Sequence, residues 1–352
     1  MNFCSDNTAP AHPKILAAVE RANRGPAMPY GNDPLTKRIE KRIAEIFERD
    51  CAVFLVGTGT AANALALGAV TPPYGAIFCH PEAHINSDEC GAPEFYSGGA
   101  KLVHVPGMHG KIAAADLAAA IAESGLGNVH HVQASAVSLS QVTEAGTVYS
   151  VAELKSIANV AHDAGLALHV DGARFANALV SLGCSPAEAT WKAGVDVLSF
   201  GATKNGAFAA EAVVFFDPAR ARDMGYRRKR AGQLWSKMRF IAAQFDGYLS
   251  GDLWLKNARV SNRLAAQLGR GLDGLPGVSL DHPVQANEVF VSMSKALADA
   301  LEADGFAFYR WDGEGTDRQT LRLVTHFAID PAHVAKFVKR AQVHAQTLKN
   351  SV

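Results

Sequence analysis

Three short segments of the sequence combine residue types that could bind a charged small molecule and react with it. The first is Gly57-Thr58-Gly59-Thr60, which lies between an apolar run and an alanine-rich run. A glycine turn between a strand and a helix directs free backbone N–H groups and the positive end of the helix dipole at an anion. This segment is therefore a candidate phosphate site.

The same turn is compatible with two other interpretations. Gly57, Gly59 and Ala62 fit the G-x-G-x-x-A pattern of dinucleotide-binding folds, and Glu82 lies about where a ribose-binding acid is expected. A glycine turn of this composition can also be purely structural. From this segment alone, all three interpretations remain open.

The second segment is an apolar run, 166–170, that ends in Asp171 and is followed by a tight turn and Arg174. In doubly wound sheets, ligands bind at such strand ends. A buried carboxylate needs a cationic partner there, and the protonated nitrogen of a pyridine ring is one. Taken alone, Asp171 is better explained as the cap of the following helix.

The third segment places Lys204 after the apolar run 195–200, among small residues. Small neighbours would let an aldehyde reach the amine, and desolvation would favour its neutral, nucleophilic form. A lone lysine in a loop is usually just solvated. However, a phosphate turn, an acid and a lysine, in this order at strand ends, are what pyridoxal 5′-phosphate requires. A dinucleotide fold explains neither Asp171 nor Lys204.

Strands and helices must alternate along the chain to position these segments. Apolar runs separated by amphipathic or alanine-rich stretches indicate a mostly parallel, doubly wound sheet with helices on both faces. We predict strands at 51–56, 76–79, 101–105, 130–136, 166–170 and 195–200, and helices at 35–47, 61–70, 116–122 and 151–164.

The length of 352 residues exceeds what one hydrophobic core usually supports, so we expect two domains. The larger, cofactor-binding domain would span residues 1–255, including an N-terminal segment. A smaller α+β domain would span 256–352, with strands at 288–293, 306–311 and 320–326. Its last helix would begin at Asp330 as cap and Pro331 in the first turn.

The composition excludes several classes of partner. Lysine plus arginine equals aspartate plus glutamate at 34 each, so no overall charge attracts nucleic acid or anionic lipid, and a small-molecule substrate is expected. Five scattered cysteines without a C-x-x-C pair disfavour a disulfide framework and a zinc site, and no metal is expected. We find no signal peptide or membrane span and therefore expect a cytoplasmic protein.

Together with two N-terminal motifs, these segments resemble the L-threonine aldolase family of type I pyridoxal-phosphate enzymes, from Ser5 to the last helix. Ser5-Asp6-Asn7 is similar to the family's opening SDN, and Tyr30-Gly-Asn-Asp33 is similar to its tyrosine motif. The resemblance implies a type I PLP-dependent transferase-like fold. It also implies that Ser5 meets the substrate carboxylate and that Tyr30 reaches the cofactor phosphate of a neighbouring subunit. A tyrosine that serves a neighbouring subunit in turn implies a homo-oligomer, commonly a tetramer.

The resemblance also implies roles for the residues around the cofactor. Gly59 and Thr60 would hold its phosphate, and His84 would stack on its pyridine ring. Asp171 would pair with the ring nitrogen, and Lys204 would be the Schiff-base lysine. His84, Asp171 and Lys204 are therefore the expected catalytic residues.

Arginine side chains are the implied ligands of the substrate carboxylate. Arg174 and Arg322 resemble the two family residues with this role, and a guanidinium can grip a carboxylate with two hydrogen bonds. The basic run 227–230, with Lys229 in it, and Arg239 would lie near the phosphate.

One departure from the family pattern bears on the chemistry. Where many members have a histidine in an Asn-Thr-His-Asn stretch, this chain has Gln141, which cannot act as a base. We expect Gln141 to contact the substrate, and His84 or a water molecule to handle the proton of the β-hydroxyl group. Related sequences with glutamine here include aldolases that act on phenylserine, so an aromatic β-substituent is an open alternative.

We therefore predict a PLP-dependent carbon–carbon lyase that cleaves L-threonine, L-allo-threonine and related β-hydroxy amino acids to glycine and an aldehyde. β-Elimination, transamination and racemisation start from the same cofactor and differ in the bond that breaks, so the fold alone cannot choose among them. A distant alternative is an NAD-dependent oxidoreductase built on Gly57, Gly59 and Ala62.

Overall fold

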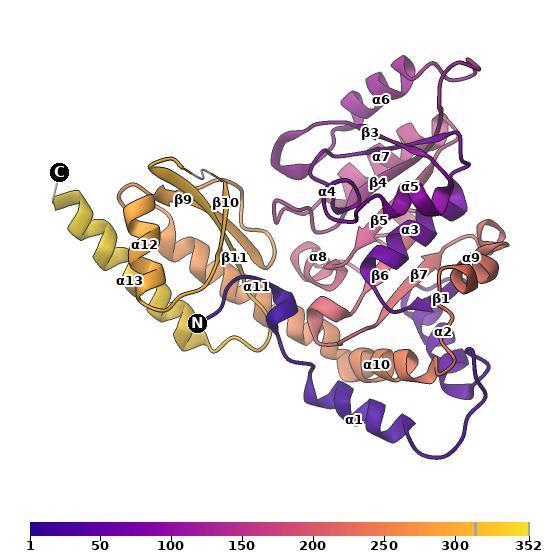
Figure 1. Ribbon diagram of the computed structural model, residues 1–352, viewed down its shortest axis with the longest axis horizontal. Coiled ribbons are helices and arrows are strands. Elements are labelled where there is room, and N and C mark those ends of the chain that lie inside the picture. Colours follow the sequence, from indigo (N-terminus) through magenta and orange to yellow (C-terminus); the bar gives the residue numbers. More distant parts are fainter. Residues whose placement is uncertain (313–314, 351–352) are drawn as a thin grey trace.

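The computed structural model describes residues 1–312 and 315–350. Figure 1 shows a larger unit around a seven-stranded sheet and a smaller unit around a four-stranded sheet, with helix α11 (Leu253–Leu272) running between them. The start of the chain lies against the smaller unit, where Asn2 forms an isolated parallel bridge with Ala307.

The larger sheet has the strand order β1-β7-β6-β5-β4-β2-β3. Strands β2 to β6 pair in parallel, and β7 pairs antiparallel with both β1 and β6. This is the mostly parallel sheet expected from the sequence. Its strands are β1 (Ala52–Val56), β2 (Gly75–Cys79), β3 (Lys101–His104), β4 (Gln133–Ser140), β5 (Ala167–Gly172), β6 (Val197–Gly201) and β7 (Glu211–Phe215).

Strand β7 is absent from the sequence-based prediction. It follows β6 after a short connection that contains Lys204 in a single 3₁₀ turn and no α-helix, and it inserts between β1 and β6. The rule of alternating strands and helices therefore fails at this point. As a result β7 begins at the same edge of the sheet at which β1 and β6 end.

Helices cover both faces of the larger sheet, as β7 shows most clearly. Its Ala212 and Val214 side chains join the core cluster that includes α2, α7 and α10, whereas Val213 and Phe215 join the cluster of α3 and α9 on the other face. The helices of this unit are α1 (Pro13–Ala22), α2 (Pro34–Ile46), α3 (Gly59–Val70), α4 (His84–Ser87), α5 (Ala92–Ser97), α6 (Ala114–Glu123), α7 (Val151–Asp163), α8 (Phe175–Leu182), α9 (Met224–Arg230) and α10 (Arg239–Leu249).

The smaller unit packs two helices against an antiparallel sheet. Phe3 packs against Phe306 and Phe337 in its core, so residues from the start of the chain stabilise this unit. Asp330 accepts a hydrogen bond from the N–H of Ala332, as expected for a helix cap. The elements are β8 (Ser279–Leu280), β9 (Glu288–Ser294), β10 (Tyr309–Asp312), β11 (Arg318–Val324), α12 (Lys295–Ala303) and α13 (Pro331–Asn350).

Helix α11 contributes to both cores. Leu253 and Trp254, in its first turn, belong to the core of the larger unit, and Leu264 and Leu268 belong to that of the smaller unit. The proposed division between residues 255 and 256 falls within this helix, and it remains a prediction.

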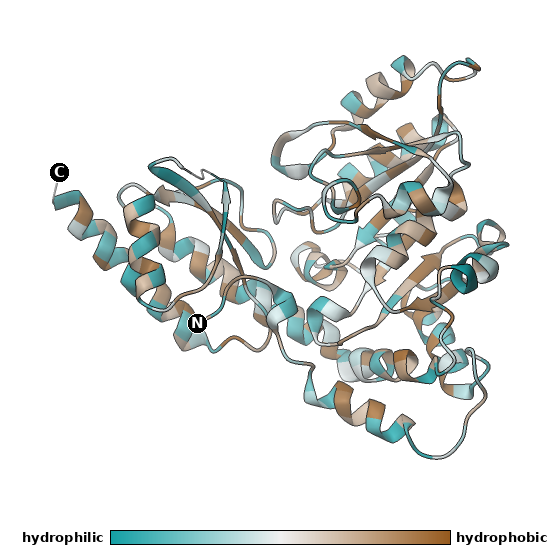
Figure 2. Ribbon diagram, in the orientation of Figure 1, coloured by the Kyte–Doolittle hydropathy of each residue, from teal (hydrophilic) through white to brown (hydrophobic). Residues whose placement is uncertain are grey.

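Hydrophobic and hydrophilic residues are distributed unevenly over the elements of the fold. Figure 2 shows hydrophobic residues along the strands of the larger sheet, whereas α9, which carries the basic run 227–230, is mainly hydrophilic. Within the described part of the chain, no helix combines the length and the apolar character needed to cross a membrane.

Candidate active site

A cavity of about 780 Å³ lies at the edge of the larger sheet where the parallel strands end. Gly57 follows β1, Asp171 lies near the end of β5, and Lys204 follows β6. Ser5 from the N-terminal segment and Arg322 from β11 line the same cavity. Doubly wound sheets bind ligands at this edge. The three segments singled out in the sequence therefore converge with residues of the smaller unit.

The glycine turn presents the N-terminus of α3 to the cavity. Thr58 caps the helix by accepting a hydrogen bond from the N–H of Ala61 at 3.2 Å, while N–H groups of the first turn have no acceptor within the helix. A Cβ atom at Gly57 would lie 2.5 Å from the indole ring of Trp235, whereas one at Gly59 would meet no atom within 4 Å. The turn therefore needs glycine at position 57 for packing and leaves open space at position 59.

A chain of buried hydrogen bonds connects Asp171 to His84. Asn63 on α3 donates to Asp171 at 2.7 Å and to Glu89 at 2.8 Å. The Nδ1 atom of His84 lies 2.8 Å from the same oxygen of Glu89. The N–H of Ala173 donates to the other oxygen of Asp171. These contacts fix the Asp171 carboxylate and the His84 ring relative to each other.

The environment shifts the pKa values of both ends of the His84–Glu89 pair upward. The hydrogen bond to Glu89 raises the pKa of His84, although burial opposes this change. Burial, aided by the nearby charge of Asp171, raises the pKa of Glu89.

Lys204 lies in a short 3₁₀ helix, Thr203–Asn205, whose position is fixed by hydrogen bonds of its last residue. Asn205 donates hydrogen bonds to the hydroxyl of Tyr248 at 3.0 Å and to the carbonyl of Trp254 at 2.8 Å. The Lys204 side chain is partly buried and lines the cavity. An amine held on a rigid turn at a cavity, among small residues, is suited to covalent attachment of an aldehyde.

Two carboxyl groups of that wall are perturbed by burial. Burial raises the pKa of Glu211, at the start of β7, to about 7, and the nearby Asp171 adds to the rise. Burial likewise raises the pKa of Glu144, in the loop after β4, to about 7. The charge of Lys204 lowers both pKa values in part.

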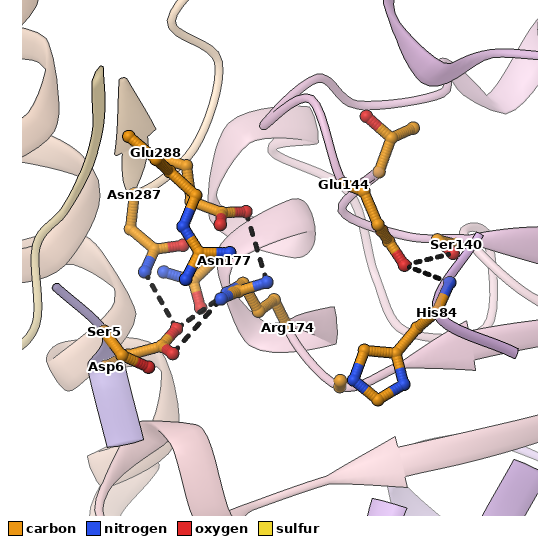
Figure 3. Close-up of polar contacts among 12 residues, drawn as sticks. Ser5, Asp6, His84, Ser140, Glu144, Arg174, Asn177, Asn287 and Glu288 are labelled. Atoms are coloured by element: carbon orange, nitrogen blue, oxygen red, sulfur yellow. Dashed lines mark hydrogen bonds and ion pairs between the residues drawn. The ribbon is translucent and has the colours of Figure 1, made fainter. Parts of the chain in front are cut away.

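Arg174 already has two carboxylate partners, as Figure 3 shows. Its Nε atom lies 2.6 Å from Asp6, and its Nη1 atom lies 3.2 Å from Glu288. The Arg174 side chain is 9% exposed, and those of Asp6 and Glu288 are 2% and 1% exposed. Although burial opposes it, Arg174 lowers the pKa of Asp6. The cluster joins the N-terminal segment, the larger unit and the smaller unit.

Arg322 has a different environment. Its guanidinium lies between the rings of Tyr309 and Trp311, at 5.3 and 4.5 Å from their centroids. It donates one hydrogen bond, to the carbonyl of Cys4 at 3.3 Å, and its buried Nε atom has no hydrogen-bond partner among the described residues. No ion pair joins it to a carboxylate within residues 1–312 and 315–350. Arg322 is therefore free to bind an anionic ligand.

The chain is similar to proteins of known family. A family model described as beta-eliminating lyase matches residues 2–296. The chain belongs to this family. It is 47% identical to a low-specificity L-threonine aldolase of Pseudomonas aeruginosa over 90% of this chain and 91% of that protein. A solved threonine aldolase structure from Leishmania major matches with a TM-score of 0.91 and 29% identity, covering 98% of this chain and 99% of that one.

A more distant match shows the fold of this lyase alone. The structure of Oryza sativa TDC with PLP and tryptamine aligns with a TM-score of 0.76 at 14% identity, covering 99% of this chain and 83% of that chain. Together with the threonine aldolase structure, it confirms the type I PLP-dependent fold expected from the sequence.

Most of the expected site residues of the lyase line one cavity. These are Ser5, Gly59, Thr60, His84, Asp171, Arg174, Lys204 and Arg322. They come from the N-terminal segment, four strand ends of the larger sheet and β11 of the smaller sheet. Their spatial convergence is a property of the structure, and their individual roles remain proposals.

Gln141 does not join them, contrary to the expectation that it contacts the substrate. Its side chain is fully buried and forms two hydrogen bonds with the backbone of Tyr149, one donated at 2.8 Å and one accepted at 2.9 Å. Both ends of the amide are therefore occupied. The physical reason is that the loop after β4 folds back toward Tyr149 and presents Val142 and Glu144 to the cavity instead.

Tyr30, Lys229 and Arg239 lie together outside the cavity. The Lys229 amine lies 4.7 Å from the centroid of the Tyr30 ring, and Arg239 donates to the carbonyl of Gly25 in the segment before Tyr30. Tyr30 is 45% exposed. None of the three lines the cavity of this chain. The expectations that Tyr30 serves a neighbouring subunit and that Lys229 and Arg239 lie near the phosphate remain predictions.

The sequence analysis missed several residues of the cavity wall. Asn63, Glu89, Glu144, Glu211 and Glu288 are polar side chains at or near its surface. Asn63 had a detectable signal, since it is the single amide in the otherwise apolar helix α3. The glutamates had none, because their position depends on how distant segments pack together.

Proposed function

We propose that this lyase uses pyridoxal 5′-phosphate to cleave L-threonine, L-allo-threonine and related β-hydroxy amino acids into glycine and an aldehyde. The observation that carries this proposal is the convergence of the α3 N-terminus, Asp171 and Lys204 in one cavity that also contains Arg322. The 47% identity to a low-specificity L-threonine aldolase supports the choice of reaction.

The residues of the cavity fit the cofactor. The first-turn N–H groups of α3, at Gly59 and Thr60, suit its phosphate, and Asp171 suits a protonated ring nitrogen. His84, fixed by Glu89, would lie against the ring, and Lys204 would hold the aldehyde carbon. When bound, the cofactor supplies an electron sink for the bond that breaks at Cα.

The chain's own residues would orient the substrate. Arg322, whose Nε atom has no hydrogen-bond partner among the described residues, would bind the substrate carboxylate, and Ser5 lines the same cavity. Arg174 is held by Asp6 and Glu288, so we propose that it positions this wall and completes the positive side of the carboxylate site. A carboxylate fixed in this way directs the Cα–Cβ bond for cleavage.

An aromatic β-substituent such as that of L-phenylserine is part of the proposal. Phe208, Tyr309 and Trp311 line the cavity, and each is 50% exposed. Large exposed aromatic side chains at a cavity favour an apolar substituent over a charged one. Gln141 lies outside the cavity, so the proposal of an aromatic β-substituent depends on these three aromatic side chains.

We also propose a homotetramer that acts in the cytoplasm on free amino acids. The Tyr30–Lys229–Arg239 surface is polar, aromatic and outside its own cavity, as expected for residues that complete a site in another subunit. The described cysteines Cys4, Cys51, Cys79, Cys90 and Cys184 are all free thiols, which suits a reducing compartment.

The test of the cofactor assignment compares Lys204→Ala with Lys192→Ala. Lys192 is a surface lysine paired with Glu48, so its loss should leave the site unchanged. We expect Lys204→Ala to lose both the visible absorbance of bound cofactor and aldehyde release from L-threonine, and Lys192→Ala to keep both. Full cleavage by Lys204→Ala would refute the proposal.

A further inference from the structure

Glu144 occupies a specific place in the cavity wall beside His84. Its Oε1 atom accepts hydrogen bonds from the backbone N–H of His84 at 2.8 Å and from the hydroxyl of Ser140 at 3.1 Å. Figure 3 shows these two contacts on one side of the site and the Arg174 cluster on the other. The carboxyl group is therefore fixed through one oxygen. Its second oxygen has no hydrogen-bond partner among the described residues, and the side chain lines the cavity.

His84 is poorly suited to accept a proton at the same place. Its Nδ1 atom is engaged by Glu89, which is itself held by Asn63. The hydrogen bond to Glu89 raises the pKa of His84, so the ring stays protonated, and unable to accept a further proton, up to a higher pH than a free histidine. The stacked ring and the proton acceptor are thus better assigned to two different residues.

Resting on the proposed function, we propose that Glu144 is the catalytic base that removes the proton from the β-hydroxyl group of the substrate. The carboxylate takes the hydroxyl proton, and the O–H electron pair becomes the second bond of the new carbonyl group. The Cα–Cβ bond breaks at the same time, and its electron pair stays with the glycine fragment, for which the bound cofactor would be the electron sink. The products of this step are the free aldehyde, protonated Glu144 and the glycine fragment, which leaves as glycine once its Cα atom has taken up a proton.

The surroundings of Glu144 suit this role. Burial and the charge of Asp171 raise its pKa to about 7, while the His84 N–H and the charge of Lys204 limit the rise. A base works best when its pKa lies near the working pH, because it is then both available and strong enough. Glu288 contributes a further negative charge from the smaller unit.

The decisive variant is Glu144→Gln in the cofactor-loaded protein. Its amide oxygen can still accept from His84 and Ser140, so the fold and the cavity shape are kept while proton acceptance is lost. Two reactions are compared: acetaldehyde release from L-threonine, and exchange of the α-hydrogen of glycine with deuterium from the solvent. Glycine exchange needs proton transfer at Cα and involves no β-hydroxyl group.

We expect Glu144→Gln to lower the rate of cleavage on the order of a hundredfold or more, with glycine exchange unchanged. In the wild type, kcat/KM for cleavage should rise with pH through an apparent pKa near 7, the value to which burial raises the pKa of Glu144, and this rise should vanish in Glu144→Gln. Glu144→Asp, which keeps a carboxylate, should cleave slowly and retain the pH dependence. Glu82→Gln, at an exposed glutamate nearby, should match the wild type in both reactions.

Two results would overturn the assignment. If Glu144→Gln cleaves L-threonine at the wild-type rate, another group is the base. If it loses cleavage and glycine exchange to the same extent, Glu144 supports the whole site and has no specific role in the β-hydroxyl step. Failure of the proposed function looks different, because the wild type itself would then exchange glycine without releasing an aldehyde.

Discussion

At the scale of single residues, Asn63 connects the two fixed groups at the centre of the site, because it donates hydrogen bonds to both Asp171 and Glu89. The sequence predicted Asp171 and Lys204 because each follows an apolar run and carries a chemically distinctive group, and it predicted Gly59 from the glycine turn. Asn63 and Glu89, which orient Asp171 and His84, were not found. Their contacts join α3 to the segment between α4 and α5, and no local pattern encodes a contact of this kind.

Asn63 should be important for stability as well as for the site. Replacing it in Asn63→Leu leaves Asp171 and Glu89 without the donor that both share, so two buried carboxyl groups lose a hydrogen bond. We expect a loss of about 1–3 kcal/mol in the free energy of unfolding, measured with urea.

The matched control is Asn86→Leu, at an exposed asparagine in the neighbouring helix α4. Its two side-chain hydrogen bonds, with the carbonyl of Pro81 and with His104, are exposed, so its loss should cost less than about 1 kcal/mol. Equal effects at both positions would contradict the structural role assigned to Asn63.

At the scale of elements, periodicity predicted most of the larger sheet because buried parallel strands read as continuous apolar runs. β1, β2, β5 and β6 lie within two residues of their predicted limits. β4 lies further along the chain than predicted, at Gln133–Ser140, and β7 was missed. In both places the strand is defined by pairing with its neighbours, which a single segment does not reveal.

The centre of the sheet contains a buried histidine that should make stability depend on pH. His169 on β5 lies 2.9 Å from the hydroxyl of Ser138 on β4 and 3.0 Å from that of Ser199 on β6. Burial lowers its pKa to about 4, and the nearby Asp171 only partly offsets this. The folded protein therefore holds His169 neutral at a pH where the unfolded chain, with a pKa of about 6.5, is protonated.

The protein should become less stable in acid, because the unfolded chain binds a proton at His169 more readily than the folded protein does. As the pH falls from about 6.5 to about 4, the unfolded chain gains a proton that the folded state does not, so His169 should cost up to about 3 kcal/mol of stability. We expect His169→Gln, whose amide can bond to both serines, to reduce the loss of stability in acid. Identical pH profiles of the wild type and His169→Gln, measured by urea unfolding, would contradict this.

At the scale of the whole molecule, the site exists because two units and the N-terminal segment meet. Composition and length predicted two domains and a small-molecule partner, but they could not predict that Arg174 would be held by Asp6 and Glu288. These three residues are distant in the sequence, and they connect the N-terminal segment, the loop after β5 and the start of β9. Arg174 thus holds these three segments together at the wall of the cavity.

Removing that guanidinium should destabilise the protein strongly. Arg174→Met leaves two buried carboxylates without a cation, and we expect a loss of about 3–5 kcal/mol in the free energy of unfolding. Lys192→Met breaks an exposed ion pair with Glu48 and should cost less than about 1 kcal/mol. The prediction is wrong if urea unfolding gives similar values for the two variants.

The central claim is that this chain breaks the Cα–Cβ bond of β-hydroxy amino acids with PLP on Lys204. Its most direct test is to incubate the cofactor-loaded protein with L-threonine, and separately with L-phenylserine, and to quantify the products. The account predicts glycine and the matching aldehyde, acetaldehyde or benzaldehyde, in equal amounts. Formation of a keto acid and ammonia, with no glycine and no aldehyde, would contradict it and indicate elimination at Cβ instead.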